Sequence, residues 1–292
     1  MDIANLQAFL AVADSGSFSQ AAEHLFLTQP AISKRIAQLE AELGVKLFDR
    51  IGRRITLTEA GETLLQRSRT ILQELEDTRR AIGNLSQVVG GHIIIGTSHH
   101  IALHRLSPAL KQFNRLYPQV DLDLRFLDSE TICSMVEHGE FELGIITLPT
   151  IDIPALQVIP IWTDELIVVC GETHTLAKSA RIDVKDLFEY AAIMPDPKTY
   201  TRSIIEEALC QGHRELKIRL NTNNLETIKV LVEAGLGWSV LPKTMLSSSL
   251  IELNVEHATM QRQLGVVFHK ERTLSHAARV MIDIVRDCVT GG

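Results

Sequence analysis

The hydrophobic pattern at the start of the chain predicts three short helices. In the first, apolar side chains recur at helical spacing and form one face, made by Leu6, Phe9, Leu10 and Ala13. Gly16 ends this stretch. Ser17 then begins a second helix, because a serine with glutamine three residues later has the spacing of a capping box. These elements indicate a compact helical module at the N-terminus.

The third predicted helix has one apolar stripe and one polar face. Thr28 is placed to cap it, and Pro30 falls in the first turn, where a proline removes no intrahelical hydrogen bond. The apolar stripe consists of Ile32, Ile36, Leu39 and Leu43. The outward face and its flanks carry Gln29, Pro30, Ser33, Lys34, Arg35 and Gln38. This pattern favours a helix-turn-helix, whose second helix reads the major groove of DNA. A small helical bundle with a solvated face is the alternative.

Two strand-like segments follow and predict a β-hairpin wing. Residues 47–48 are apolar, residues 55–57 alternate apolar and polar side chains, and the segment between them carries Arg50, Arg53 and Arg54. Residues 28–58 hold six basic and three acidic residues, a local charge of +3 in a chain of formal net charge −7. Because phosphate attraction is screened within about 10 Å at cellular salt, the local sign outweighs the total. The module therefore predicts binding to double-stranded DNA.

The run SFSQAAEHLFLTQPAISKRIAQLEAELGVKLFDR, followed by LTEAG, resembles the N-terminal domain of LysR-type transcriptional regulators. The resemblance implies that DNA meets the residues Thr28, Gln29, Pro30, Ser33, Lys34 and Arg35. It implies contacts with the DNA backbone or minor groove by Arg50, Arg53 and Arg54. It also implies a domain order along the whole chain: a winged helix-turn-helix at 1–58, a linker helix at 59–87, a hinge at 88–91 and an effector-binding domain at 92–292.

The segment from 58 to 87 shows a heptad stripe that predicts a long helix with a partner. The stripe contains Leu64, Ser68, Ile71, Leu75, Thr78, Ile82 and Leu85. Charged residues flank it and favour dimerisation through Leu64, Ile71, Leu75, Ile82 and Leu85 over packing against the protein's own second domain. The resemblance implies a dimer or a dimer of dimers, which predicts an inverted-repeat DNA site. RNA polymerase is a further candidate partner.

From Val88 onward, apolar strand-like runs alternate with helical stretches. This rhythm predicts an α/β domain with a largely parallel sheet. The net charge here is −6, from 19 basic and 25 acidic residues, so this half is not expected to bind DNA. The resemblance implies a two-lobed α/β fold similar to type 2 periplasmic binding proteins. We expect lobe I at 92–161 and 265–292, and lobe II at 162–264.

Hydroxyl-bearing loops follow several predicted strands and suggest a ligand site at the strand ends. The candidate residues are Thr97, Ser98, His99, His100, Ser129, Thr147, Thr201 and Arg202. Hydroxyls and free amides at helix starts favour an anion, although serine and threonine before a helix are most often only caps. The resemblance implies that positions matching Ser98, His100, Ser129, Thr147 and Thr201 line the effector cleft. No cofactor is expected besides a small-molecule effector.

The histidines and cysteines allow two further kinds of chemistry, a metal site and a disulfide switch. His100 and His104 have i, i+4 spacing and could bind a metal, but no third ligand is evident, so no metal is expected. The four cysteines are far apart in sequence and indicate reduced, packed thiols rather than a disulfide switch: Cys133, Cys170, Cys210 and Cys288.

Other function classes receive less support. The chain has no phosphate-binding loop, nucleophile elbow or dinucleotide fingerprint, and therefore no enzyme is expected. An exported solute-binding protein would need a secretory signal, which the acidic first residues do not resemble. No apolar run is long enough to span a bilayer, so no membrane partner is expected. We therefore expect a cytoplasmic transcriptional regulator controlled by a small molecule.

Overall fold

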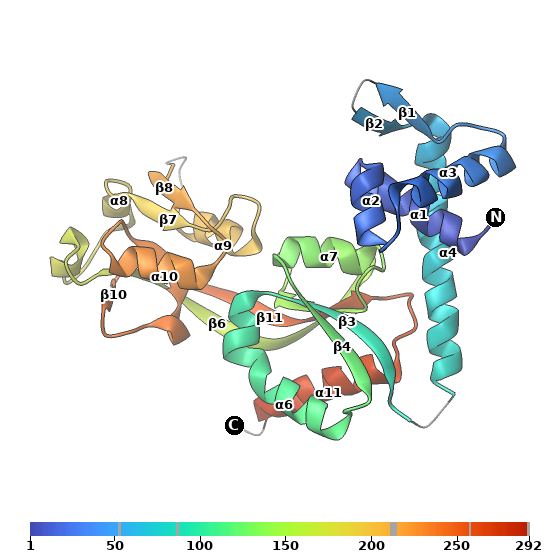
Figure 1. The fold of residues 1–292 in the computed structure, drawn as a ribbon. Coiled ribbons are helices and arrows are strands. Elements are labelled where there is room, and N and C mark those ends of the chain that lie inside the picture. Colours follow the sequence, from blue (N-terminus) through green and yellow to red (C-terminus); the bar gives the residue numbers. More distant parts are fainter. Residues whose placement is uncertain (52–53, 86–87, 211–214, 257, 291–292) are drawn as a thin grey trace. The chain divides into compact units, whose positions relative to one another are not determined.

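A computed structural model describes residues 1–292 except 52–53, 86–87, 211–214, 257 and 291–292, and it describes the backbone alone at 50, 51, 54, 289 and 290. The chain divides into two compact units, Met1–Ile82 and Gly83–Gly292. Figure 1 shows the elements of each unit. No helix in the described part of the chain combines the length and hydropathy needed to cross a membrane.

Three short helices, a hairpin and a long helix build the first unit. In order these are α1 (Ile3–Ser15), α2 (Phe18–His24), α3 (Gln29–Leu43), β1 (Phe48–Ile51), β2 (Arg54–Leu57) and α4 (Glu59–Gly83). The Ser17 hydroxyl accepts from the Gln20 amide and caps α2, and Thr28 caps α3 in the same way. The predicted three-helix module is therefore present with its expected caps.

The core of the first unit uses the apolar stripe predicted for α3. Ile32 and Leu39 are fully buried and belong to the same cluster as Phe9. Leu43, which we placed on that stripe, is instead 40% exposed. It is the last residue of α3, and Gly44 follows in a left-handed conformation at φ +70°, so the chain turns away before Leu43 can reach the core.

The wing is a two-stranded antiparallel hairpin that joins α3 to α4. Phe48 of β1 pairs with Leu57 of β2. The Thr58 hydroxyl donates to the Lys46 carbonyl at 2.7 Å and accepts from the Gly61 amide, which ties the start of α4 to the strand before it. A Cβ on Gly61 would lie 2.2 Å from the Leu47 carbonyl oxygen, so only glycine allows this approach.

Helix α4 ends earlier than the heptad stripe suggested. It stops at Gly83, and Leu85 therefore lies beyond the helix. Leu64 packs against the core of its own unit, whereas Ile71 is 39% and Ile82 is 64% exposed. Along the stripe, exposure thus increases towards the C-terminal half of the helix.

The second unit contains a seven-stranded mixed sheet and a two-stranded parallel sheet. The larger sheet has the order β10-β6-β11-β5-β3-β4, with β9 also paired to β6. Its strands are β3 (Gly91–Thr97), β4 (Val120–Phe126), β5 (Leu143–Thr147), β6 (Leu156–Gly171), β9 (Ser239–Pro242), β10 (Leu250–Glu252) and β11 (Met260–His269). The smaller sheet pairs β7 (Ala192–Met194) with β8 (Ile218–Asn221).

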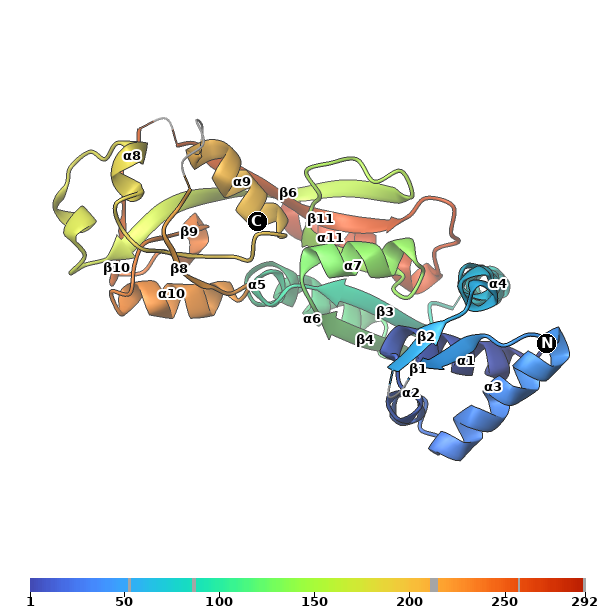
Figure 2. The same ribbon diagram turned by 90° about the horizontal axis from the view of Figure 1, so that it is seen from above.

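Helices cover both faces of these sheets. The α-helices are α5 (His99–Ile101), α6 (Ser107–Leu116), α7 (Ser129–Glu137), α8 (Val184–Leu187), α9 (Tyr200–Leu209), α10 (Leu225–Glu233) and α11 (His276–Thr290). A π-helix, η1 (Ala102–Leu106), joins α5 to α6, and two 3-10 turns are η2 (Thr175–Lys178) and η3 (Lys243–Met245). In Figure 1, α7 lies on one face of the layer that contains β3 and β4, and α6 with α11 lie on the other; Figure 2 views this layer from the side of α7.

Strand β6 shows how alternating side chains build two cores in the lobe that contains α9 and α10. Val168 packs in a cluster with Ile205 of α9, and Val169 packs with Ile228 of α10. Because successive strand residues point to opposite faces, the run ELIVVC fills both layers. This run is the second half of β6, which begins at Leu156.

The long strands β6 and β11 run side by side from one lobe to the other (Figure 1). Their antiparallel register shifts between Leu264 and Gly265, and a Cβ on Gly265 would lie 2.1 Å from the Ile159 carbonyl oxygen. The prediction of a largely parallel sheet was wrong, because β11 returns along β6 and joins β5 antiparallel. We propose that this shift marks the boundary between lobes I and II.

Candidate ligand pocket and nucleic-acid interface

The residues predicted to face DNA lie along the N-terminal half of α3. Thr28, Gln29, Pro30 and Lys34 are exposed, and Ser33 is half-buried. The Gln29 side-chain amide donates to the Ser33 hydroxyl at 3.4 Å, so these two polar groups lie together one turn apart. A helix start with exposed amide, hydroxyl and ammonium groups can contact base edges and phosphates.

Two predicted contacts stand apart from this set. Arg35 is half-buried, and its Nη1 donates to the Ala4 carbonyl of α1 at 3.4 Å, so it braces α3 against α1. Of the wing arginines, Arg53 lies outside the described residues, and so do the side chains of Arg50 and Arg54.

In the second unit, a cavity of about 400 Å³ opens between the lobes. Its walls are contributed by Ser98, His99, His100, Phe126, Leu127, Asp128, Ser129, Glu130, Thr131, Thr147, Pro195, Thr199, Thr201, Asn223, Asn224, Leu225, Glu226 and Arg262. Six of the eight predicted effector residues are in this lining: Ser98, His99, His100, Ser129, Thr147 and Thr201.

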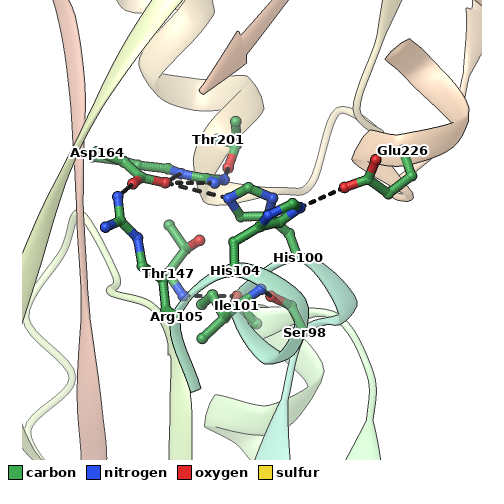
Figure 3. A network of polar contacts seen from close by, with 11 residues as sticks. Ser98, His100, Ile101, His104, Arg105, Thr147, Asp164, Thr201 and Glu226 are labelled. Atoms are coloured by element: carbon green, nitrogen blue, oxygen red, sulfur yellow. Dashed lines mark hydrogen bonds and ion pairs between the residues drawn. The ribbon is translucent and has the colours of Figure 1, made fainter. Parts of the chain in front are cut away.

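The loops after β3 and β4 supply one wall. Ser98 caps α5 by accepting from the Ile101 amide at 3.4 Å, as Figure 3 shows. The Ser129 hydroxyl accepts from the Thr147 amide at 3.1 Å, which fastens the start of α7 to the end of β5. Both hydroxyls therefore have structural partners, but only Ser98 is a helix cap as the capping interpretation expected.

Thr97 and Arg202 lie outside the pocket lining. Thr97 is fully buried and its hydroxyl donates to the Ile145 carbonyl at 2.8 Å, because it is the last residue of β3 and faces the sheet interior. Arg202 is 6% exposed and donates to Glu206 at 2.7 Å and to the Pro195 carbonyl at 3.3 Å. Both side chains stabilise the walls instead of facing the cavity.

A buried charge cluster lies beside the pocket, centred on Asp164 of β6. Arg262 of β11 donates to Asp164 through Nε and Nη2 at 3.3 and 3.0 Å. Arg105 of η1 donates to the other carboxylate oxygen at 2.6 Å (Figure 3). Burial opposes ionisation of Asp164, but the nearby His100 ring and the two arginines hold its pKa well below the usual range. Arg262 Nη1 also donates to Thr201 at 3.0 Å.

The two histidines after β3 have different surroundings. His99 is exposed and stacks on Phe126, with ring centroids 5.1 Å apart. His100 is 5% exposed, and burial lowers its pKa, partly opposed by Asp164. A neutral imidazole at this position can accept one hydrogen bond and donate another.

Polar contacts join the two lobes at the rim of the pocket. Asn223 donates to Asp128 at 2.8 Å, and the Tyr200 amide donates to Glu130 at 2.5 Å. Burial raises the pKa of Glu130, although the Tyr200 amide lowers it. These two hydrogen bonds connect α7 of one lobe with the starts of α9 and α10 of the other. A change in either contact therefore alters the connection between the lobes.

Sequence reasoning missed several pocket residues. Asn223 and Asn224 precede a predicted helix, and that capping signal could have identified their loop. Glu130 follows the predicted Ser129 directly and lies in the first turn of α7. The sequence around Arg262 and Asp164 does not predict that they line or support a pocket, because a charged residue in a strand is normally predicted to face solvent.

The comparisons with known families decide the identity of both units. Residues 3–62 match the model described as "Bacterial regulatory helix-turn-helix protein, lysR family", and residues 86–289 match the one described as "LysR substrate binding domain". The chain belongs to the LysR family. This LysR protein is a DNA-binding transcriptional regulator with a substrate-binding domain.

Relatives and solved structures agree with the assignment to the LysR family. The chain is 33% identical over 288 residues to a probable RuBisCO transcriptional regulator of Synechocystis sp., covering 95% of this chain and 83% of that protein. A full-length OxyR variant from Pseudomonas aeruginosa shares the fold with a TM-score of 0.69 at 21% identity, over 98% of this chain and 95% of that one. Full-length CbnR in complex with its target DNA gives a TM-score of 0.64 at 20% identity, over 99% of this chain and 100% of that one.

Proposed function

We propose that this LysR regulator binds a small anionic effector in the pocket between its lobes, and that the effector changes its binding to DNA. Three helices start at this pocket from distant parts of the sequence: α7, α9 and α10. Helix N-termini carry partial positive charge and free amides, which favour a carboxylate or sulfate group. This convergence of helix starts is the observation that carries the proposal.

The same lining restricts which anions fit. Asp128, Glu130 and Glu226 also line the cavity, while Arg262 is already paired with Asp164. A molecule with several negative charges would be repelled by these carboxylates. We therefore infer an effector with one anionic group and, elsewhere on the molecule, hydrogen-bond donors for the acidic rim.

The effector would act by shifting the equilibrium between lobe arrangements. Asn223–Asp128 and Tyr200–Glu130 are contacts between lobes that also line the pocket, so a ligand competing for these groups changes the relative free energy of the arrangements. The long strands β6 and β11 are the connection through which the lobes would reorient.

Helix α4 is the proposed dimerisation element. Its exposed apolar residues Ile71 and Ile82 lie eleven positions apart, which places them on one stripe of the helix. A two-fold dimer, or a dimer of dimers, would bind an inverted-repeat DNA site. The contact with RNA polymerase and the cytoplasmic location stay predictions from the sequence.

The experiment has two stages. A thermal-shift screen of metabolites on the full chain identifies a stabilising effector, and fluorescence anisotropy then measures DNA binding with and without it. Thr201→Val removes a pocket hydroxyl with little change of shape and should weaken effector binding about tenfold or more. Thr173→Val, at an exposed threonine outside the pocket lining, is the matched control and should bind as the wild type does.

The proposal fails if the effector leaves DNA binding unchanged, or if Thr201→Val and Thr173→Val bind it equally well. Recovery of a chemically altered effector after incubation would indicate turnover and contradict a purely regulatory pocket.

A further inference from the structure

His100 and His104 lie together on one side of the helix that follows β3. Their ring centroids are 4.8 Å apart (Figure 3). His104 belongs to the π-helical turn η1, which separates α5 from α6. Single π turns inside helices are frequent at functional sites, because the wider turn changes the direction of side chains. The i, i+4 pair noted in the sequence is therefore a pair in space.

A third ligand comes from the opposite lobe. Glu226, in the first turn of α10, lies 2.7 Å from His104 through Oε1 and Nε2. One potential ligand atom from each of the three residues lies within 4.8 Å of the other two. Within the described residues this is the one such group of three or more histidine, cysteine or carboxylate side chains. Glu226 lies 122 residues from His104 in the sequence, so the spacing of the two histidines alone gave no third ligand.

His100 is an unusual buried histidine. Within the described part of the chain, neither of its ring nitrogens has a hydrogen-bond partner, and both are shielded from solvent. The nearest charged group is Asp164, whose Oδ2 lies 3.5 Å from Nε2. Buried polar atoms without partners are costly, so each requires an explanation. A ligand for one of these ring nitrogens would remove that cost.

We propose that His100, His104 and Glu226 form a binding site for a divalent transition-metal ion such as Zn²⁺. Two imidazoles and a carboxylate are a ligand set used for zinc, with a fourth position left to water or ligand. Ligands about 2.1 Å from a tetrahedral ion are about 3.4 Å apart, so the three groups need small side-chain rotations to converge. Two of these side chains, His104 and Glu226, are 35% and 40% exposed and have room to rotate.

Two further charged residues lie beside the site: the carboxylate of Asp164 and the guanidinium of Arg262, which pairs with it. Asp164 beside His100 can orient the ring, as carboxylates commonly do for metal-bound histidines. Arg262 is the charge that opposes a metal ion here, because it lowers the pKa of His100. Its guanidinium is held by Asp164 at 3.0 Å, so part of that charge is neutralised locally.

An ion bound here would join η1 of lobe I to α10 of lobe II. It would strengthen the connection that His104 and Glu226 already make through a hydrogen bond. His100 and Glu226 also line the effector pocket, so a bound ion would lie at its wall. Titration of the metal alone, without any effector, tests the metal site by itself, and the two proposals can therefore fail separately.

The test is calorimetric titration of Zn²⁺ into the chelator-treated full chain, with Co²⁺ absorption as a second measurement. Wild type should bind one Zn²⁺ per chain, and its Co²⁺ form should show visible bands of a tetrahedral nitrogen and oxygen site. His104→Ala and Glu226→Gln should each weaken Zn²⁺ binding by about a hundredfold or more, since even loss of an outer partner costs ten- to a hundredfold.

His92→Ala is the matched control. It removes an exposed histidine paired with a carboxylate, Asp121 at 2.8 Å, that has no third ligand within the described residues. This variant should bind Zn²⁺ as the wild type does. The proposal is overturned if wild type binds no Zn²⁺, if His104→Ala binds like His92→Ala, or if the Co²⁺ spectrum shows thiolate charge-transfer bands from cysteine ligands.

Discussion

Asp164 and Arg262 face each other across neighbouring strands and form a buried ion pair beside the pocket. They are direct partners in the register of β6 and β11, their side chains are 0% and 4% exposed, and their closest atoms are 3.0 Å apart. A buried carboxylate between two arginines stays ionised, and it holds the strands where they pass between the lobes.

This pair predicts a stability effect that depends on pH. Because the folded pKa of Asp164 lies below its unfolded value, the stabilisation is present above about pH 4 and is lost as pH falls below that. At pH 7, Asp164→Asn should lower the free energy of unfolding by about 3 kcal/mol, since it leaves buried cations unpaired. Urea unfolding should show this difference shrinking below about pH 4.

The control for that experiment is Asp152→Asn, at an exposed carboxylate of the same unit. Its stability should follow the wild type within about 0.5 kcal/mol. A difference between Asp164→Asn and wild type that stays constant from pH 7 to pH 3 would contradict the assigned ionisation.

Two glycines of α4 offer a matched pair of substitutions. Gly61→Ala should destabilise the first unit by about 3 kcal/mol, because the added Cβ would meet the Leu47 carbonyl oxygen at 2.2 Å. Gly83→Ala has no atom within 4 Å of the added carbon and should be neutral or stabilising by up to about 1 kcal/mol. Hydrogen exchange of the core helices α1–α3 measures the first substitution, and hydrogen exchange at the end of α4 measures the second. Equal effects of the two substitutions would show that the close approach at Gly61 does not hold.

The first unit shows what local patterns can predict. Its helices follow from apolar periodicity and from caps such as Ser17 and Thr28, all within a few residues of the element they begin. The errors lie at the ends: Leu43 is exposed, and α4 ends before Leu85. Helix ends depend on a turn or a tertiary contact beyond the periodic stretch, so the period alone does not determine them.

The turn between α2 and α3 contains a strained residue. Phe26 has φ +53° and a side chain that is 96% exposed. A bulky residue in this conformation is disfavoured, whereas asparagine tolerates it, and no packing would be lost. Phe26→Asn should therefore raise the stability of the first unit by about 1 kcal/mol. Hydrogen exchange of α2 and α3 measures this, and a loss of stability would mean that the exposed ring has a folded-state partner.

The polar residues of α3 should divide into two roles in DNA binding. Lys34→Ala should weaken binding to all sequences alike and reduce the slope of log affinity against log salt by about 1, because it removes one phosphate contact. Gln29→Ala should instead weaken the preferred site by about 1–3 kcal/mol and leave nonspecific binding unchanged. Anisotropy titrations at several salt concentrations measure both quantities.

Lys185→Ala, an exposed lysine of the second unit, is the control for the salt slope and should leave it unchanged. If Gln29→Ala lowers specific and nonspecific affinity equally, the assignment of Gln29 to base recognition is wrong.

Local sequence patterns predict only part of the pocket. Ser98 and Ser129 could be chosen because they follow strands and precede helices, and Thr147 because it ends a strand, since strand ends gather at one edge of a sheet. Glu226 lies 122 residues from His104, and Asp164 lies 98 residues from Arg262. Their meeting depends on the pairing of β6 with β11 and on the placement of the lobes, which no short-range period encodes.

We propose that α3 gives this LysR regulator its sequence-specific binding to DNA. The most direct measurement is the affinity of the full chain for a duplex from its own upstream region and for a scrambled duplex, with wild type and with Ser33→Glu/Lys34→Glu. Wild type should prefer its own site by about a thousandfold or more, and the double variant should lose that preference. Equal affinity of wild type for both duplexes, or unaltered binding by the double variant, would contradict this role of α3.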